Sequence, residues 1–147
     1  MTLILLLNMA ATWAMFGLIW FVQLVHYPLF GQVGDGAFAG YQVEHMRRAT
    51  WVVAPIMVVE GITALGLVLR HPIGIYTPTL WLGILLLVLI WVSTALLQVP
   101  RHQSLLDGFD RTAHSALVRS NWIRTIAWTI RSALALYWTA AVSCLYG

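Results

Sequence analysis

Four long apolar runs, joined by short polar segments, constrain this chain more than any other feature of its sequence. The runs cover about residues 3–25, 50–70, 79–99 and 122–145. A helix of roughly 20 apolar residues is long enough to cross the hydrocarbon core of a bilayer. Only 9% of the residues are charged, whereas soluble domains average about 25%. The sequence therefore predicts an all-α integral membrane protein, with residues 1–147 folded as a single transmembrane domain in an antiparallel four-helix bundle.

The segments between the apolar runs differ in character. Residues 31–36 are rich in glycine and predict a loop after a first span that stops at His26-Tyr27-Pro28, because proline disfavours helical geometry in the residue before it. Residues 38–48 have helical spacing but carry several charges, so we expect an interfacial helical segment before the second span. Pro100 marks the exit of the third span, and residues 101–120 predict a second, partly helical interfacial segment before the fourth.

The arginines are distributed unevenly between the two sides of the predicted bundle. One side carries Arg47, Arg48, Arg101, Arg111, Arg119 and Arg124, whereas the other carries only Arg70. By the positive-inside rule the Arg-rich side faces the cytoplasm, which predicts a multi-pass protein of the cell inner membrane with both termini outside the cytoplasm. The net charge of +3 comes from arginines that flank apolar runs, so it gives no case for nucleic-acid binding.

An antiparallel arrangement of the spans brings polar groups from separate helices to one face of the bilayer. These groups are His26, His45, His102 and Asn121. Further polar residues continue the same helix faces at spacings of three or four: Gln23 with His26, Arg48 with His45, Thr94 and Gln98 with His102, and Arg124, Trp128 and Arg131 with Asn121. One interpretation is that these amphipathic side chains extend separately to water at the helix ends. We favour the other, in which the stripes line one polar pocket open to the cytoplasm, because separate extension requires no shared face.

Two kinds of chemistry suit such a pocket. In a catalytic site, His26 or His45 would act as base or ligand. Arg48, Asn121 and Arg124 would then stabilise developing negative charge. In a cofactor site, His26, His45 and His102 would ligate a metal ion or a haem through neutral imidazole nitrogens. The spacing does not decide between them, because no two histidines lie four apart on one helix and no CxxC or HExxH motif occurs.

Two charged residues lie deep in the predicted spans. Glu60 follows Trp51 by nine residues and Arg131 follows Trp122 by nine, so both should reach the same depth from the same side. A lone charge at mid-membrane costs at least about 2.5–3.5 kcal/mol, which mutual pairing avoids. We predict a buried Glu60–Arg131 ion pair. It would either lock two spans together or also form the floor of the pocket.

Three short segments carry a resemblance to a known group of proteins. They are His26-Tyr27-Pro28-Leu29-Phe30, Gln98-Val99-Pro100-Arg101-His102, and Asn121-Trp122-Ile123-Arg124-Thr125 with Trp128 and Arg131. In these segments and in span layout, the chain resembles small, mostly uncharacterised bacterial four-span membrane proteins that are distantly similar to the anthrone-oxygenase-like family. The resemblance implies oxygenation of an aromatic, polyketide-type substrate, in members regarded as needing no metal.

These observations leave competing functions open. The first is an oxidoreductase or oxygenase that acts on a lipophilic small molecule entering from membrane lipid. The second is a non-catalytic subunit that binds a pigment or cofactor within a homo-oligomer or a larger membrane complex, for which the smooth aliphatic run at residues 82–90 is the support. A transporter is a weaker third, because nothing in the sequence predicts a broken helix. His71 and His114 are expected to be solvated.

Overall fold

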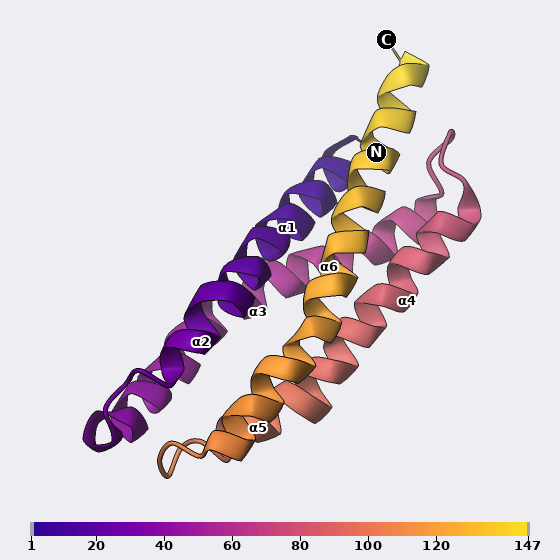
Figure 1. Ribbon diagram of the computed structural model, residues 1–147. Helices are drawn as coiled ribbons and strands as arrows, with labels where there is room; N and C mark the ends of the chain where they lie inside the picture. Colours follow the sequence, from indigo (N-terminus) through magenta and orange to yellow (C-terminus); the bar gives the residue numbers. More distant parts are fainter. Residues whose placement is uncertain (1, 147) are drawn as a thin grey trace.

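Four long helices make up the structure, a computed structural model that describes residues 2–146 (Figure 1). The first helix comprises α1 (Thr2–Phe21), a π-helical turn η1 (Val22–His26) and α2 (Tyr27–Phe30). The second is α3 (Asp35–Arg70). The third comprises α4 (Thr77–Ser93), a second π-helical turn η2 (Thr94–Gln98) and α5 (Val99–Gln103), and the fourth is α6 (Arg111–Tyr146).

The helices form a closed antiparallel ring in the order α1, α3, α4, α6. Helix α1 packs along both α3 and α6, α6 also packs along α4, and contacts between α3 and α4 complete the ring. The N-terminal end of α1 and the C-terminal end of α6 therefore lie at the same end of the bundle (Figure 1). The predicted all-α four-helix bundle is confirmed.

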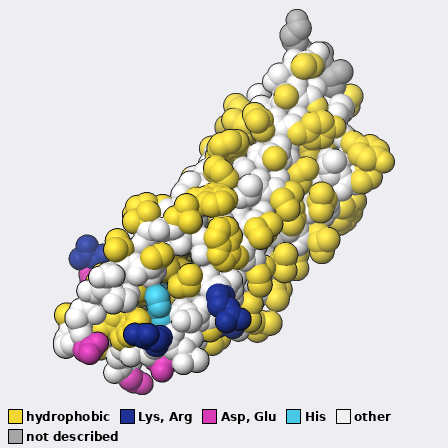
Figure 2. Space-filling view, in the orientation of Figure 1, with side chains coloured by type: hydrophobic (Ala, Val, Ile, Leu, Met, Phe, Trp, Pro, Cys, Tyr) yellow, Lys and Arg dark blue, Asp and Glu magenta, His cyan; other side chains and the backbone are white. Residues whose placement is uncertain are grey.

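Three of the helices are long and apolar enough to cross a membrane. They are Thr2–Phe30, Asp35–Arg70 and Thr77–Gln103, and together they indicate a multi-pass membrane protein. Helix α6 has the same length as α3, but its sequence includes Arg119, Arg124 and Arg131 and it does not meet the same criterion. A crossing by α6 therefore stays a prediction. Charged side chains gather at one end of the bundle, and most of the remaining visible surface is apolar (Figure 2).

Two prolines that the sequence suggested as helix ends lie inside continuous helices. Pro28 and Pro100 each follow a π-helical turn by two residues. Proline lacks an N–H and its ring crowds the carbonyl four residues earlier, and a locally widened turn is one way for a helix to accommodate it. It does so here through i to i−5 hydrogen bonds, from the Tyr27 N–H to the Val22 carbonyl and from the Val99 N–H to the Thr94 carbonyl. The prediction that the first helix stops at His26-Tyr27-Pro28 is wrong, because the helix runs on to Phe30.

The two expected interfacial segments are mostly extensions of the long helices. Residues 38–48 belong to α3 without a break, and residues 111–120 are the first turns of α6. The Asp110 side chain caps α6, because its Oδ1 accepts a hydrogen bond from the Ala113 N–H at 2.5 Å. The polar end of the bundle is therefore built on rigid helices, with loops only at 31–34 and 104–110.

Buried apolar side chains form three clusters along the bundle axis. The cluster near the termini includes Leu5, Leu67 and Trp138. The middle cluster contains Met15, Ile19, Met57, Leu86, Ile90, Ala127 and Trp128. The cluster at the polar end contains Tyr27, Phe30, Phe38, Leu105 and Leu117. The candidate site lies between the second and third clusters.

Candidate functional site

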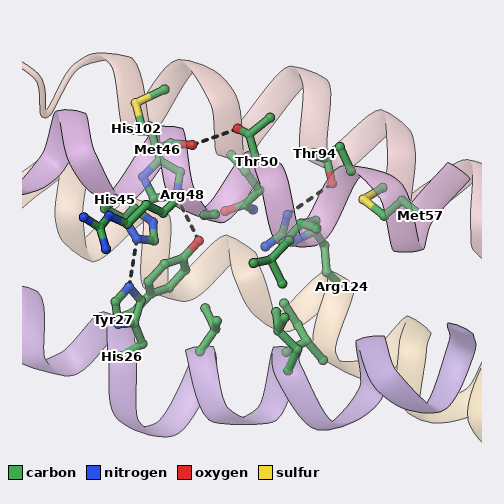
Figure 3. A pocket seen from close by; sticks show the side chains of 18 of the residues that line it. His26, Tyr27, His45, Met46, Arg48, Thr50, Met57, Thr94, His102 and Arg124 are labelled. Atoms are coloured by element: carbon green, nitrogen blue, oxygen red, sulfur yellow. Dashed lines mark hydrogen bonds between the residues drawn. The ribbon is translucent and has the colours of Figure 1, made fainter.

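A cavity of about 780 Å³ opens between the four helices near the polar end. Its walls are mainly apolar and include Met15, Ile19, Val53, Met57 and Trp128. Its polar lining comes from all four helices and includes His26, Tyr27, His45, Arg48, Thr94, Gln98, His102 and Arg124 (Figure 3). A largely apolar cavity with a few converging polar groups is the usual form of a small-molecule site.

Two histidines from different helices form a hydrogen-bonded pair on the cavity wall. His26 Nε2, at the end of η1, lies 3.0 Å from His45 Nδ1 on α3 (Figure 3). The widened turn before Pro28 ends at His26, so the proline and the site are linked through local backbone geometry. One of the two contacting nitrogens must accept the hydrogen bond and is therefore unprotonated. The pair thus contains at least one neutral imidazole, which is able to take up a proton.

His102 lies beside His45 and is hydrogen-bonded to two other side chains, Tyr27 and Gln42. The rings of His45 and His102 lie 5.3 Å apart. His102 Nε2 lies 2.9 Å from the Tyr27 hydroxyl, and Nδ1 lies 3.0 Å from Gln42 Nε2. Gln42 Nε2 also donates to the His102 carbonyl oxygen at 2.9 Å. Both ring nitrogens of His102 are therefore engaged by protein groups.

Arg124 is the buried cation of the cavity. Its Nε and Nη2 donate to Asn121 Oδ1 at 3.0 and 2.8 Å, and its Nη1 donates to Thr94 Oγ1 at 3.2 Å. Asn121 in turn donates to Gln23 Oε1 at 2.9 Å, which ties the network to η1. Arg124 also lies over the Trp128 ring, 5.8 Å from its centroid. Across residues 2–146, Glu44 and Glu60 are the only carboxylates in ion pairs, and neither pairs with Arg124.

Arg48 lies at the rim of the cavity and belongs to a surface cluster. Its Nε donates to Glu44 Oε1 at 2.6 Å, and Arg47 Nη2 donates to the same oxygen at 2.6 Å. The Arg48 side chain is 76% exposed, so its charge is shared between Glu44 and solvent. Of the two cavity arginines, only Arg124 is desolvated.

The predicted Glu60–Arg131 ion pair is present below the cavity. Arg131 Nε donates to Glu60 Oε1 at 2.8 Å, and both side chains are almost fully buried. Glu60 also accepts from Thr12 Oγ1 at 2.9 Å and from Trp128 Nε1 at 3.1 Å, while Arg131 Nη1 donates to the Gly83 carbonyl. Because Trp128 lines the cavity and contacts Glu60, its indole ring separates the cavity from the ion pair.

The three histidines proposed as metal or haem ligands are neighbours, but their donors are directed at protein groups. The shared His26–His45 hydrogen bond and the two partners of His102 occupy four of the six ring nitrogens. Within the part of the chain that the structure describes, no group of three His, Cys, Asp or Glu side chains has the placement of a metal site. The arrangement fits a chain of hydrogen-bonded side chains better than a ligand set.

The structure brings most of the predicted site residues to one cavity. His26, His45, His102, Arg48 and Arg124 all line it. Asn121 stands behind Arg124 and orients its guanidinium.

Sequence reasoning missed Tyr27 and Gln42, which complete the surroundings of His102. It also expected His114 to be solvated, yet His114 is half-buried and its Nε2 lies 2.8 Å from the Tyr27 carbonyl. The position of Tyr27 between His26 and Pro28 was the available signal, because the π-helical turn there changes which side chains face inward.

The comparisons with known proteins add no relative. No protein-family model matches the chain, and no curated protein and no solved structure matches it.

Proposed function

We propose that the protein is a membrane oxidoreductase, of the oxygenase type, that acts on a lipophilic substrate in the cavity. The observation that carries this proposal is the hydrogen-bonded His26–His45 pair, which places at least one neutral imidazole in a mainly apolar cavity. The volume of about 780 Å³ suits a molecule of several fused rings or one long chain. Lipid surrounds the helices, so an apolar substrate would reach the cavity from the bilayer.

The chemistry that suits this site begins with proton transfer. An imidazole of the His26–His45 pair removes a proton from an acidic CH2 group that is conjugated with a carbonyl of the substrate. The resulting enolate carbon forms a C–O bond to dioxygen, which is the oxidant. The O–O bond of the hydroperoxide then breaks, so that the CH2 group and O2 become a ketone and water. The resemblance to the anthrone-oxygenase-like family supports this class of reaction.

The proposed site lies at the cytoplasmic face of the inner membrane. Arg47, Arg48, Arg101, Arg111 and Arg119 lie on the parts of α3, α5 and α6 at the end of the bundle where the cavity opens, and Arg70 is the last residue of α3 at the other end. This distribution supports both termini outside the cytoplasm, provided that α6 crosses the bilayer. Its packing along α1 and α4 supports that crossing, because Arg124 and Arg131 are shielded inside the bundle.

Oxygen consumption by the protein in nanodiscs tests the catalytic proposal, with anthrone as the substrate. We expect uptake above that of empty nanodiscs, and a loss of about 100-fold in rate for His26→Gln or His45→Gln, the size of a missing general base. His71→Gln is the matched control, because His71 is exposed at the other end of the bundle and contacts Thr77. Equal rates in all variants would overturn the proposal.

The absorption spectrum of the same preparation tests the alternative. A bound pigment or tetrapyrrole, together with the absence of oxygen uptake, would favour a non-catalytic subunit of a larger complex. A colourless protein that oxidises anthrone would support the enzyme.

The lone cysteine provides a test of orientation. Cys144 is exposed near the end of α6, so a membrane-impermeant maleimide should label it in intact spheroplasts. In a Cys144→Ser background, Ser104→Cys should be labelled only after permeabilisation, because Ser104 is exposed at the opposite end. The reverse pattern would place the cavity on the outer face.

A further inference from the structure

The orientation of one amide fixes the protonation of His102. The His102 carbonyl oxygen can only accept a hydrogen bond, so the Gln42 atom 2.9 Å away must be the amide nitrogen. The same nitrogen lies 3.0 Å from His102 Nδ1, so its second hydrogen points at that ring atom. His102 Nδ1 is therefore an acceptor. In the neutral ring the proton then resides on Nε2.

That tautomer leaves the Tyr27 hydroxyl with an unused hydrogen. His102 Nε2–H donates to the Tyr27 oxygen at 2.9 Å, so the phenol accepts from His102 and must donate elsewhere. Among the described residues, no group accepts that hydrogen of the Tyr27 hydroxyl. Tyr27 lines the cavity, and its hydroxyl points toward His102 between the helices (Figure 3).

Arg124 offers further donors beside that hydroxyl. A guanidinium has five N–H groups, and three of those of Arg124 are used by Asn121 and Thr94. Arg124 and Tyr27 line the same cavity (Figure 3). The Thr94 hydroxyl has no hydrogen left to donate to a ligand, because it donates to the Ile90 carbonyl at 2.7 Å and accepts from Arg124. Gln98 also lines the cavity, and its buried Oε1 has no hydrogen-bond partner among the described residues.

We infer that Tyr27 and Arg124 together form a receptor for an oxygen anion, a carboxylate or an enolate, on the polar end of the bound molecule. The inference rests on the proposed function and names the chemical class of the substrate. A site that presents two kinds of donor and one uncompensated positive charge favours an anionic acceptor and rejects an amine. In the reaction, the same two groups would stabilise the enolate oxygen that forms when the imidazole pair removes the proton.

Photo-crosslinking with matched lipophilic probes tests this inference. The probes are a diazirine-bearing hexadecanoic acid and its alcohol and amine analogues, added to the protein in nanodiscs of zwitterionic lipid. We expect saturable labelling of cavity peptides by the acid at concentrations about tenfold lower than by the alcohol, and weaker labelling still by the amine; tenfold corresponds to about 1.4 kcal/mol.

Variants distinguish the contribution of the two donors to binding from that of the apolar walls. Tyr27→Phe and Arg124→Met should each remove the preference for the acid without changing labelling by the alcohol, and Arg124→Lys should retain part of it. Tyr137→Phe and Arg111→Met are matched controls, because both side chains are exposed on α6 away from the cavity. Both should behave like the unmodified protein.

The outcomes distinguish this inference from the proposed function. Equal labelling by the three probes, or a preference for the amine, would overturn the anion receptor while leaving a lipophilic cavity intact. A preference for the acid without oxygen uptake would support the receptor and contradict the oxygenase. Absence of saturable labelling by every probe would overturn both.

Discussion

Two arginines on α6 have opposite electrostatic surroundings. They lie seven residues apart, which is about two helical turns. Arg131 is 1% exposed and pairs with Glu60, which also accepts hydrogen bonds from Thr12 and Trp128. Arg124 is 8% exposed and pairs with amide and hydroxyl groups only. Arg131 is neutralised inside the protein, whereas Arg124 faces the cavity and no carboxylate of the described residues pairs with it.

This difference indicates a structural role for Arg131 and a ligand-binding role for Arg124. A buried charge is costly unless it is compensated, so the partners of Arg131 account for its presence in the middle of the bundle. Arg124 has hydrogen bonds that orient it, yet its charge remains uncompensated within the described chain. The fold thus provides a position beside Arg124 where a bound anion would compensate the charge, whereas Glu60 already compensates the charge of Arg131.

The largest expected effect comes from replacing only one partner of the Glu60–Arg131 ion pair. Glu60→Gln or Arg131→Met alone should lower the free energy of unfolding by about 3–5 kcal/mol, because each leaves a buried charge unpaired. The double variant should recover most of that loss, since both charges are then gone. Reversible unfolding in mixed detergent micelles would measure the three values. A double variant as unstable as the sum of the two single variants would show that the pair is not the compensating unit.

The close contact between α4 and α6 beside the Glu60–Arg131 ion pair gives the next largest effect on stability. A Cβ on Gly83 would lie 2.6 Å from a ring carbon of Trp138, and the Gly83 carbonyl accepts from Arg131. Gly83→Ala should therefore cost about 1–3 kcal/mol through overpacking. Gly17→Ala is the control, because a Cβ there meets nothing within 4 Å and alanine raises helix propensity by up to about 1 kcal/mol. A Gly83 variant as stable as the Gly17 variant would show that α4 and α6 can separate freely.

The sequence predicted the bundle and the ion pair because both follow from the lengths of the apolar runs and from the positions of residues within them. Hydrophobic length fixes where each span lies, and Glu60 and Arg131 are equally far from their respective interfaces. Helix ends were predicted less well. Pro28 and Pro100 indicated breaks, but a π-helical turn absorbs each proline and lets the helix continue. Single-residue rules for proline cannot anticipate that adjustment, since neighbouring helices determine whether a widened turn is stable.

The candidate site was predicted as a set of residues and not as a network. Periodicity placed His26, His45, His102 and Arg124 on inward faces, which the cavity lining matches. It could not identify Tyr27 or Gln42 as partners of His102, because those hydrogen bonds join residues from three different helices and depend on how the helices are rotated. Hydrogen-bond direction, which carries the anion-receptor inference, exists only in three dimensions.

The smallest effect is expected for Arg124, and it tests the comparison most directly. Arg124→Met removes a desolvated cation but leaves Asn121 Oδ1 without its two donors, a loss of about 1–3 kcal/mol. These terms oppose each other, so the free energy of unfolding should change by about 1 kcal/mol at most, far less than for Arg131→Met. Hexadecanoic acid at about 100 times its dissociation constant should then stabilise the unmodified protein by about 2.7 kcal/mol and the Arg124 variant by much less. It should stabilise Arg131→Met as much as the unmodified protein, because that cation takes no part in binding. Equal stabilisation of all three proteins would place the acid somewhere other than beside Arg124.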